Sequence, residues 1–318
     1  MKILAWSVGV LCLMAVVVAG AVWEYAGLYG LDVLVRHGGT YWIPVRADSR
    51  LLSPAMRRAL RSSPPASPGL MQWRSIAQGF DVADLPVVAE GSAVDHVLLA
   101  RIEPDRFRFV VRNSSAGDKG LDQWMTQLNA ILVVNGSYFA QDGNPDTPFL
   151  SDGLLLGPKD YDAKAGAFVA APTFTGIRNL AEQSWQMAFR NAHDAMVSYP
   201  LLLDGGASHV RKESRWLANR SFVGQDQAGR IVIGTTTDAF FSLDRLARFL
   251  LDAPLDLALA LNLDGGPVAC QGISLNGYGR KTYGRWEAQV EGDRVSLLVW
   301  PFGTVAMPVV LAVLPNQS

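Results

Sequence analysis

The chain has 318 residues, of which 49% are hydrophobic and 18% are charged, so it can bury a sizeable core and does not have the composition of a disordered protein. Its formal net charge of −1 at pH 7 lacks the basic excess of a nucleic-acid-binding protein, and no nucleic-acid partner is expected. The two cysteines and four scattered histidines exclude a disulfide scaffold and a zinc site built from these residues.

The N-terminus, residues 1–23, is an apolar segment with no charged residue from Ile3 to Trp23. Its length matches the roughly 20 residues that span a bilayer, which predicts an uncleaved anchor with the membrane as partner. Lys2 and the small residues Ala19-Gly20-Ala21 also fit a cleaved signal peptide, so both alternatives stay open. In either case we expect the remainder outside the cytoplasm, membrane-anchored or secreted, and periplasmic in a Gram-negative cell.

The remainder divides into a tether over residues 24–70 and a globular domain over residues 71–318. The stretch from Asp48 to Gly69 is rich in Ser, Pro and Arg, which is typical of a linker or surface loop. A second run without charges extends from Val295 to Leu314. Because Pro301, Gly303 and Pro308 interrupt it, we interpret this run as core strands rather than a second membrane span.

Helices and strands are mixed along the domain without strict alternation. Apolar residues alternate over 106–112, which predicts a half-buried strand, and recur at helical spacing over 118–130. A second helix is predicted to begin at Ser242, a residue favoured at helix N-termini. Short apolar strands are predicted over 131–134, 201–203, 230–235 and 257–263. This pattern predicts an α+β (mixed α/β) fold around a central mixed sheet.

Three of the predicted strands end in a polar residue that is followed by glycine. These ends are Asn135-Gly136, Asp204-Gly205-Gly206 and Asn262-Leu263-Asp264-Gly265-Gly266. A buried strand holds its last side chain rigidly at the edge of the sheet, and the glycines allow a sharp turn and close approach of a ligand. Each Asn-Gly or Asp-Gly pair is also a common turn. The recurrence of the pattern predicts one cleft at the strand ends.

Arg220 precedes another predicted strand region. A guanidinium group beside a strand can hold a phosphate through two parallel hydrogen bonds, although arginine is also common on protein surfaces.

Together these segments resemble the phosphodiester glycosidase domain family. The resemblance covers about residues 71–315 and is carried by Asn135-Gly136-Ser137-Tyr138-Phe139, by Arg220-Ser221-Phe222-Val223-Gly224 and by the Asn262–Gly266 segment. It implies an extracytoplasmic hydrolase that cleaves the glycosidic bond of a sugar-1-phosphodiester in an envelope or extracellular glycan. The alternative is a non-catalytic carbohydrate-binding or envelope polysaccharide assembly protein with the same fold. Pro267 favours that alternative, because the family usually has Ser or Thr at this point.

The reaction class suggests a role for each candidate residue. We expect Asp264 to act as nucleophile or base, Asp204 to be the second carboxylate, and Arg220 to bind the phosphate. Asn135 and Asn262 are expected to hold sugar hydroxyls. The other predicted substrate-binding residues are Gly136, Tyr138, Gly265, Gly266 and Asp238. The sequence requires no cofactor, but the many oxygen ligands of this set would suit Ca²⁺.

Overall fold

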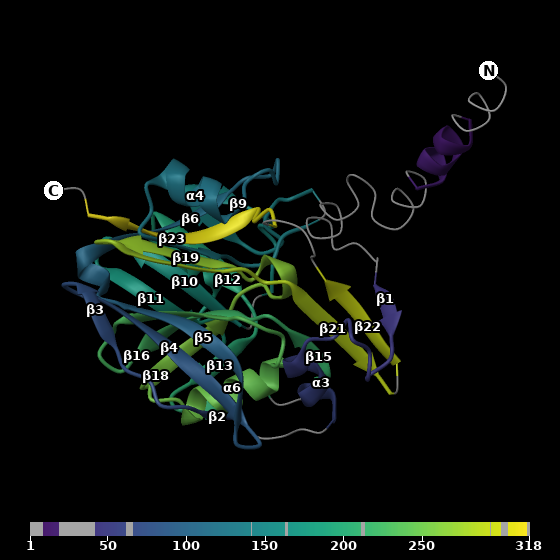
Figure 1. Ribbon diagram of the computed structural model, residues 1–318. Helices are drawn as coiled ribbons and strands as arrows, with labels where there is room; N and C mark the ends of the chain where they lie inside the picture. Colours follow the sequence, from purple (N-terminus) through teal and green to yellow (C-terminus); the bar gives the residue numbers. More distant parts are fainter. Residues whose placement is uncertain are drawn as a thin grey trace.

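The computed structural model describes residues 9–18, 42–61, 66–140, 142–162, 165–210, 214–292, 294–299 and 305–316. These residues form packed β-sheets with a few short helices, consistent with the predicted α+β class (Figure 1). The strand pairs of the described residues are antiparallel throughout the largest sheet, so the expectation of a central mixed sheet is wrong. Residues 9–18 form a helix. No helix within the described ranges is long and apolar enough to cross a membrane. The remainder of the predicted anchor or signal, residues 1–8 and 19–23, lies outside the described residues.

The largest sheet contains nine strands of the described chain. Its order is β14-β13-β18-β16-β17-β5-β4-β2, with β3 paired to β4. The strands are β2 (Ser67–Pro68), β3 (Arg74–Ala77), β4 (Phe80–Ala89), β5 (Ser92–Ile102), β13 (Leu201–Asp204), β14 (Ala207–Ser208), β16 (Ser221–Asp226), β17 (Ile231–Thr236) and β18 (Leu257–Asn262). Strand β18 inserts between β13 and β16, so its C-terminal end at Asn262 lies inside the sheet rather than at an edge strand.

Three smaller sheets complete the structure. One has the order β20-β19-β7-β23-β6, another β11-β10-β12-β8-β9, and the last β1-β22-β21-β15. Their strands are β1 (Ile43–Val45), β6 (Phe107–Asn113), β7 (Leu132–Asn135), β8 (Phe149–Ser151), β9 (Leu154–Leu156), β10 (Gly166–Ala171), β11 (Phe174–Asn179), β12 (Asp194–Ser198), β15 (Trp216–Ala218), β19 (Gln271–Leu275), β20 (Tyr278–Thr282), β21 (Trp286–Glu291), β22 (Arg294–Val299) and β23 (Val309–Pro315).

Both faces of the largest sheet are covered. On β16, Val223 belongs to a core shared with the β7 and β10 sheets, whereas its neighbour Phe222 packs against helix α6 (Leu243–Asp252). Successive residues of a strand point to opposite faces, so a strand covered on both sides must be apolar at consecutive positions. This explains the continuous apolar runs in the sequence. Helices α4 (Leu121–Leu128) and α5 (Trp185–Ala188) cover the outer faces of the smaller sheets.

The predicted elements around the candidate motifs are confirmed. The runs at 131–134, 201–203, 230–235 and 257–263 correspond to β7, β13, β17 and β18, and helix α6 follows Ser242. The Ser242 hydroxyl donates to Asp244 rather than capping the helix. The run from Val295 to Leu314 contains β22 and β23 among its described residues, as expected for core strands.

Part of the predicted tether is packed structure. Strand β1 pairs with β22, and helix α3 (Pro54–Arg61) buries Ala55 and Met56 in the core. The hydroxyl of Ser53, just before α3, donates to a carboxylate oxygen of Asp238 at 2.7 Å. Residues 42–61 therefore belong to the folded body and do not form a free linker. The boundary at residue 71 remains a prediction.

Candidate active site

Two of the predicted strand ends meet although they belong to different sheets. The side-chain amide of Asn135, at the end of β7, donates to the backbone carbonyl of Asp264 at 2.7 Å. The backbone N–H of Asp264 in turn donates to the carbonyl of Gly136 at 3.0 Å. These two contacts fix the segment after β18 against the end of β7. The Asn135, Gly136 and Asp264 positions therefore converge, as the sequence pattern indicated.

The glycines after Asp264 allow this segment to lie directly on two charged side chains. A Cβ atom on Gly265 would lie 3.1 Å from Nη1 of Arg220, and one on Gly266 would lie 2.5 Å from Oε2 of Glu287. Gly266 also has φ +69°, a conformation that side chains other than glycine rarely adopt. The Asp-Gly-Gly sequence is thus needed for close approach as well as for the turn.

Arg220 is the buried cation of the site, with only 6% of its surface exposed. Its Nε donates to the carbonyl of Phe241 and its Nη2 to the carbonyl of Trp216, at 3.3 and 2.8 Å. Within the described part of the chain, Arg220 makes no ion pair and Nη1 donates no hydrogen bond. Burial lowers its pKa, but a guanidinium group stays charged in proteins. The arrangement leaves one guanidinium nitrogen for an anionic group.

The second carboxylate of the site is Glu287, which the sequence analysis did not identify. Glu287 lies on β21, and its Oε1 accepts a 2.5 Å hydrogen bond from the indole N–H of Trp216. Burial raises the pKa of Glu287, while the Arg220 charge and the Trp216 hydrogen bond act in the opposite direction. No glycine follows Glu287, so the pattern that singled out Asp264 could not find it. The available signal was an acidic residue beside Trp286 in an otherwise half-buried strand.

The pKa of the Asp264 carboxyl group lies near neutral pH. It is half-buried, and burial followed by the Glu287 charge raises its pKa from 3.8 to about 7. The backbone N–H of Gly265, at 2.8 Å, and Arg220 oppose this rise. Two carboxyl groups that repel each other in a desolvated site titrate as a coupled pair, and one of them keeps a proton to higher pH.

A tyrosine pair borders the Asp264 side of the site. The rings of Tyr138 and Tyr199 are stacked with centroids 4.3 Å apart. The Asn262 amide donates to the Tyr138 hydroxyl at 2.8 Å and to the Tyr199 carbonyl at 3.1 Å. The Tyr138 hydroxyl donates to the same carbonyl at 3.0 Å. Burial, then the Asp264 charge, raises the pKa of Tyr138, which stays protonated.

The two asparagines make structural contacts within the site, and their predicted role in holding sugar hydroxyls stays a prediction. The amide nitrogens of Asn135 and Asn262 are bound to the protein itself. Their side-chain oxygens are buried and have no hydrogen-bond partner among the described residues. Asn135 and Asn262 thus position Asp264 and Tyr138.

One predicted site residue, Asp204, lies elsewhere. Asp204 accepts a hydrogen bond from Asn179 at 2.8 Å and pairs in register with Leu259 of β18. Leu259 precedes Asn262 by three residues, or about 10 Å of strand at ~3.3 Å per residue. Because β13 runs antiparallel to β18, Asp204 points to the other end of the sheet. This corrects the expectation that Asp204 is the second carboxylate, which is Glu287.

Asp238 makes structural contacts, and its expected role in substrate binding stays a prediction. Its carboxylate accepts from Ser53 and from the Ala239 N–H, both at 2.7 Å. Its backbone N–H donates to Asp95 at 2.9 Å. Asp238 thereby joins the segment before α3 to the loop after β17. For Ca²⁺, no group of three or more His, Cys, Asp or Glu residues with the arrangement of a metal site occurs in the described ranges.

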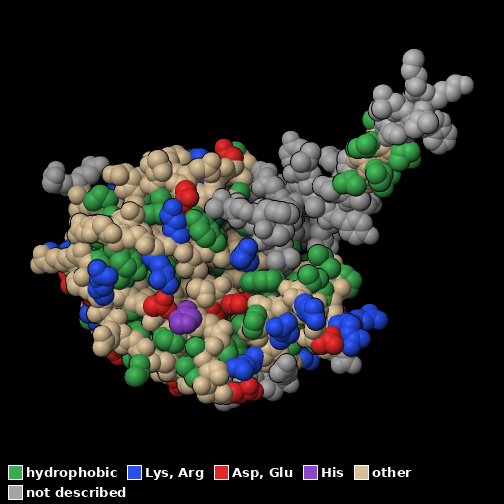
Figure 2. Space-filling model, viewed as in Figure 1, with side chains coloured by type: hydrophobic (Ala, Val, Ile, Leu, Met, Phe, Trp, Pro, Cys, Tyr) green, Lys and Arg blue, Asp and Glu red, His purple; other side chains and the backbone are tan. Residues whose placement is uncertain are grey.

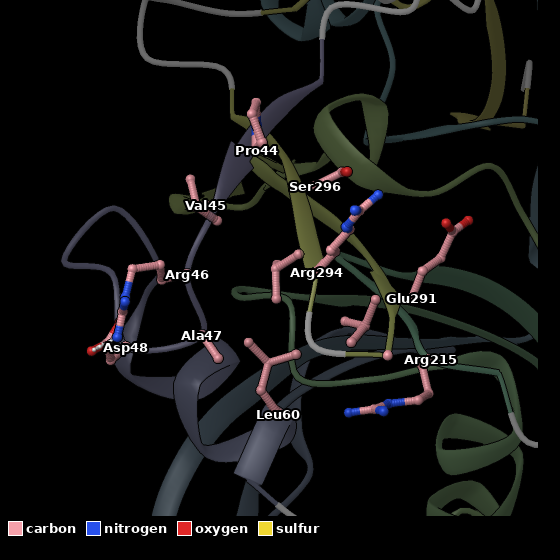
Figure 3. A pocket seen from close by; sticks show the side chains of 13 residues that line it. Pro44, Val45, Arg46, Ala47, Asp48, Leu60, Arg215, Glu291, Arg294 and Ser296 are labelled. Carbon is pink, nitrogen blue, oxygen red and sulfur yellow. Dashed lines mark hydrogen bonds and ion pairs between the residues drawn. The ribbon is translucent and has the colours of Figure 1, made fainter.

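A surface groove lies at the sheet that carries Glu287. It has a volume of about 1020 Å³ and is lined mainly by β1, β21, β22 and the loops that join them (Figure 3). Three arginines line it, Arg46, Arg215 and Arg294, and Arg46 is paired with Asp48 at 3.0 Å. Lys and Arg side chains gather at this end of the molecule in Figure 2. None of Asp264, Arg220 and Glu287 lines the groove, which is therefore separate from the candidate active site.

The chain matches a known protein family over part of its length. Residues 128–269 match the family model described as phosphodiester glycosidase. The resemblance seen in the sequence is confirmed. The matched stretch of this phosphodiester glycosidase family contains Asn135, Tyr138, Arg220 and Asp264, whereas Glu287 lies beyond its end.

A solved structure shares the fold. It is the zebrafish N-acetylglucosamine-1-phosphodiester alpha-N-acetylglucosaminidase catalytic domain auto-inhibited by its pro-peptide, with 16% identity and a TM-score of 0.52. The alignment covers 90% of this chain and 98% of that chain. A hypothetical protein from Synechocystis has 12% identity, a TM-score of 0.44 and coverage of 73% and 64% of the two chains. A putative exported protein from Burkholderia pseudomallei has 11% identity and a TM-score of 0.42, and the alignment covers 72% of this chain and 76% of that chain. Among curated protein sequences there is no significant match.

Proposed function

We propose that the chain is an extracytoplasmic hydrolase that cleaves the glycosidic bond of a sugar-1-phosphodiester in an envelope or extracellular glycan. The observation that carries the proposal is the pair of carboxylates, Asp264 and Glu287, set against the buried cation Arg220. Glycoside hydrolysis uses two carboxyl groups, and a phosphate leaving group needs a positive charge. The name of the zebrafish relative supports the same bond type.

The electrostatics favour different roles for the two carboxyl groups. Burial raises the pKa of Glu287, but the Arg220 charge and the hydrogen bond from the Trp216 indole favour its anionic form. Burial, and then the Glu287 charge, raise the pKa of Asp264 to about 7, so Asp264 is the carboxyl group that carries a proton near neutral pH. We therefore assign Asp264 as the acid and Glu287 as the carboxylate that faces the anomeric carbon. This assignment replaces the expectation that Asp264 is the nucleophile or base.

The reaction is balanced with these groups. The bond between C1 and the phosphate oxygen breaks, and its electron pair stays on the phosphate, next to Arg220. Asp264 gives its proton to the departing oxygen as Glu287 stabilises the positive charge on the sugar ring. Water then supplies hydroxide to C1, and its remaining proton restores the carboxyl pair. Phosphate is a good leaving group, so loss of Glu287 should cost more activity than loss of the acid.

Turnover tests the proposal directly. We would incubate the full-length protein with methyl phosphodiesters of glucose 1-phosphate and of N-acetylglucosamine 1-phosphate, each as both anomers. Release of free sugar, with methyl phosphate detected by ³¹P NMR, is expected for at least one of them and is expected to disappear in Glu287→Gln. Saturable binding of all of them without release would instead support the non-catalytic carbohydrate-binding function. The proposed location has its own test, since a phosphatase reporter fused after Ser318 should be active only outside the cytoplasm.

A further inference from the structure

Two aromatic side chains are unusually exposed, and both lie at the candidate active site. Tyr199 is 38% exposed and Trp216 is 39% exposed, and every other Phe, Tyr or Trp of the described ranges is buried or half-buried. Single exposed apolar residues are normal on a protein surface. Two exposed aromatic residues beside two carboxylates are different, because aromatic faces that line a polar site are typical of ligand binding.

Tyr199 is partly exposed in the neighbourhood of Asp264. Its ring is stacked on that of Tyr138 with an angle of 20° between the rings. Its carbonyl accepts hydrogen bonds from Asn262 and from the Tyr138 hydroxyl, so the backbone that carries the ring is held on two sides. The Asp264 charge is among the causes that raise the pKa of Tyr199 to about 12, after burial and the charges of Tyr161 and Asp146. The ring is therefore both rigidly placed and close to the carboxyl group.

Trp216 has the corresponding position next to Glu287. Its indole N–H donates to Glu287, and its backbone carbonyl accepts from Arg220 at 2.8 Å. Trp42 meets the indole edge to face, with centroids 5.8 Å apart and an interplanar angle of 83°. Pairing of β15 with β21 sets the strand that carries Trp216 directly beside the strand that carries Glu287. Each of the two carboxyl groups thus has one aromatic ring beside it, Tyr199 at Asp264 and Trp216 at Glu287.

We propose that Tyr199 and Trp216 bind the glycosyl ring of the substrate by stacking on its apolar C–H surfaces. This inference rests on the proposed function, because the two carboxylates flank the anomeric carbon only if a sugar is cleaved there. A ring that carries the anomeric carbon between Asp264 and Glu287 must lie next to the aromatic residue beside each of them. Stacking also removes water from exposed aromatic surface, which favours binding without any polar contact. The two aromatic residues would then select sugar phosphates over phosphates that lack a ring.

Binding of small phosphates separates ring recognition from phosphate recognition. The probes are glucose 1-phosphate, which carries the glycosyl ring, and methyl phosphate, which lacks it, measured by titration calorimetry on the full-length protein. We expect the wild type to bind glucose 1-phosphate at least 10-fold more tightly than methyl phosphate. Tyr199→Ala and Trp216→Ala should each weaken glucose 1-phosphate binding about 10-fold and leave methyl phosphate binding unchanged. Tyr199→Phe should retain wild-type binding of both probes.

Two further variants control for other effects. Trp216→Phe keeps a ring but loses the hydrogen bond to Glu287, so its binding of glucose 1-phosphate should stay within about 3-fold of the wild type. Leu251→Ala removes a side chain that is also 39% exposed but lies on α6, and it should change nothing. Equal losses of affinity for glucose 1-phosphate and methyl phosphate in the alanine variants would overturn the inference. So would unchanged binding of glucose 1-phosphate in both variants.

The same variants distinguish this inference from the proposed function. If the wild type binds glucose 1-phosphate without turnover and the alanine variants lose that binding, hydrolysis is wrong, and Tyr199 and Trp216 stack on the sugar ring in a protein that only binds it. If the wild type turns over a sugar-1-phosphodiester and both alanine variants keep its kcat/KM, the stacking inference is wrong and the proposed function stands. The expected result is turnover with a raised KM in both variants, in a protein that still binds methyl phosphate normally.

Discussion

Replacing Asp264 by Asn should stabilise the protein relative to the wild type, and this gain in the free energy of unfolding should be larger at alkaline pH than at acidic pH. Burial and the Glu287 charge raise the pKa of Asp264 from 3.8 to about 7, so the folded state favours the protonated carboxyl group. The stability linked to this group is fully present below about pH 4 and is lost as the pH rises through 7. Asn carries no charge at any pH and is insensitive to this change.

The size of the effect follows from the pKa values. The difference between about 7 and 3.8 is about 3 pKa units, which at ~1.4 kcal/mol per unit corresponds to about 4 kcal/mol. Asp264 is half-buried rather than fully buried, so this value is an upper bound. We expect Asp264→Asn to gain little relative to the wild type at pH 4.5 and to gain on the order of 2 kcal/mol at pH 8.5.

Urea denaturation at both pH values, followed by circular dichroism, measures this difference. The control is Asp252→Asn on helix α6, where the carboxylate is exposed and away from the site. Its stability relative to the wild type should not depend on pH in the same way. An Asp264→Asn protein that differs from the wild type by the same free energy of unfolding at pH 4.5 and 8.5 would refute the argument that Asp264 holds a proton.

Three further variants test the chemistry of the site. Glu287→Gln should lower kcat on a sugar-1-phosphodiester at least 1000-fold, which corresponds to about 4 kcal/mol. Asp264→Asn should lose less activity, because phosphate leaves readily. Equal losses of kcat in the two variants would contradict the assigned roles. Arg220→Lys keeps the charge but not the planar guanidinium group, and kcat/KM should fall 10-fold or more, roughly 1.4 kcal/mol, in steady-state assays. Wild-type kcat/KM in this variant would remove Arg220 from phosphate binding. Gly266→Ala should also lower kcat, since its Cβ would meet Glu287 Oε2 at 2.5 Å and its φ is +69°; full activity there would show that the loop has room to move.

Local sequence patterns were enough to predict the secondary-structure elements around the site and the part of the site that follows β7 and β18. The apolar runs that end at Asn135 and Asn262 are short enough to be strands, and each is followed by residues that turn easily. The glycines of the Asp264-Gly265-Gly266 segment already indicate a close contact, because glycine is required where the backbone lies directly on a side chain. These features depend on neighbouring residues in the chain, and the sequence shows them directly.

Sheet order and register decided the remainder. Asp204 has the same local pattern as Asp264, yet β13 runs antiparallel to β18 and directs Asp204 to the opposite end of the sheet. Glu287 has no such pattern, yet pairing of β21 with β15 brings it to Trp216, Arg220 and Asp264. The raised pKa of Asp264 follows from this meeting, because burial and repulsion act through space between residues that are distant in the chain. The sequence by itself determined which strand ends were suited to chemistry, and only the tertiary structure determined which carboxylates share a site.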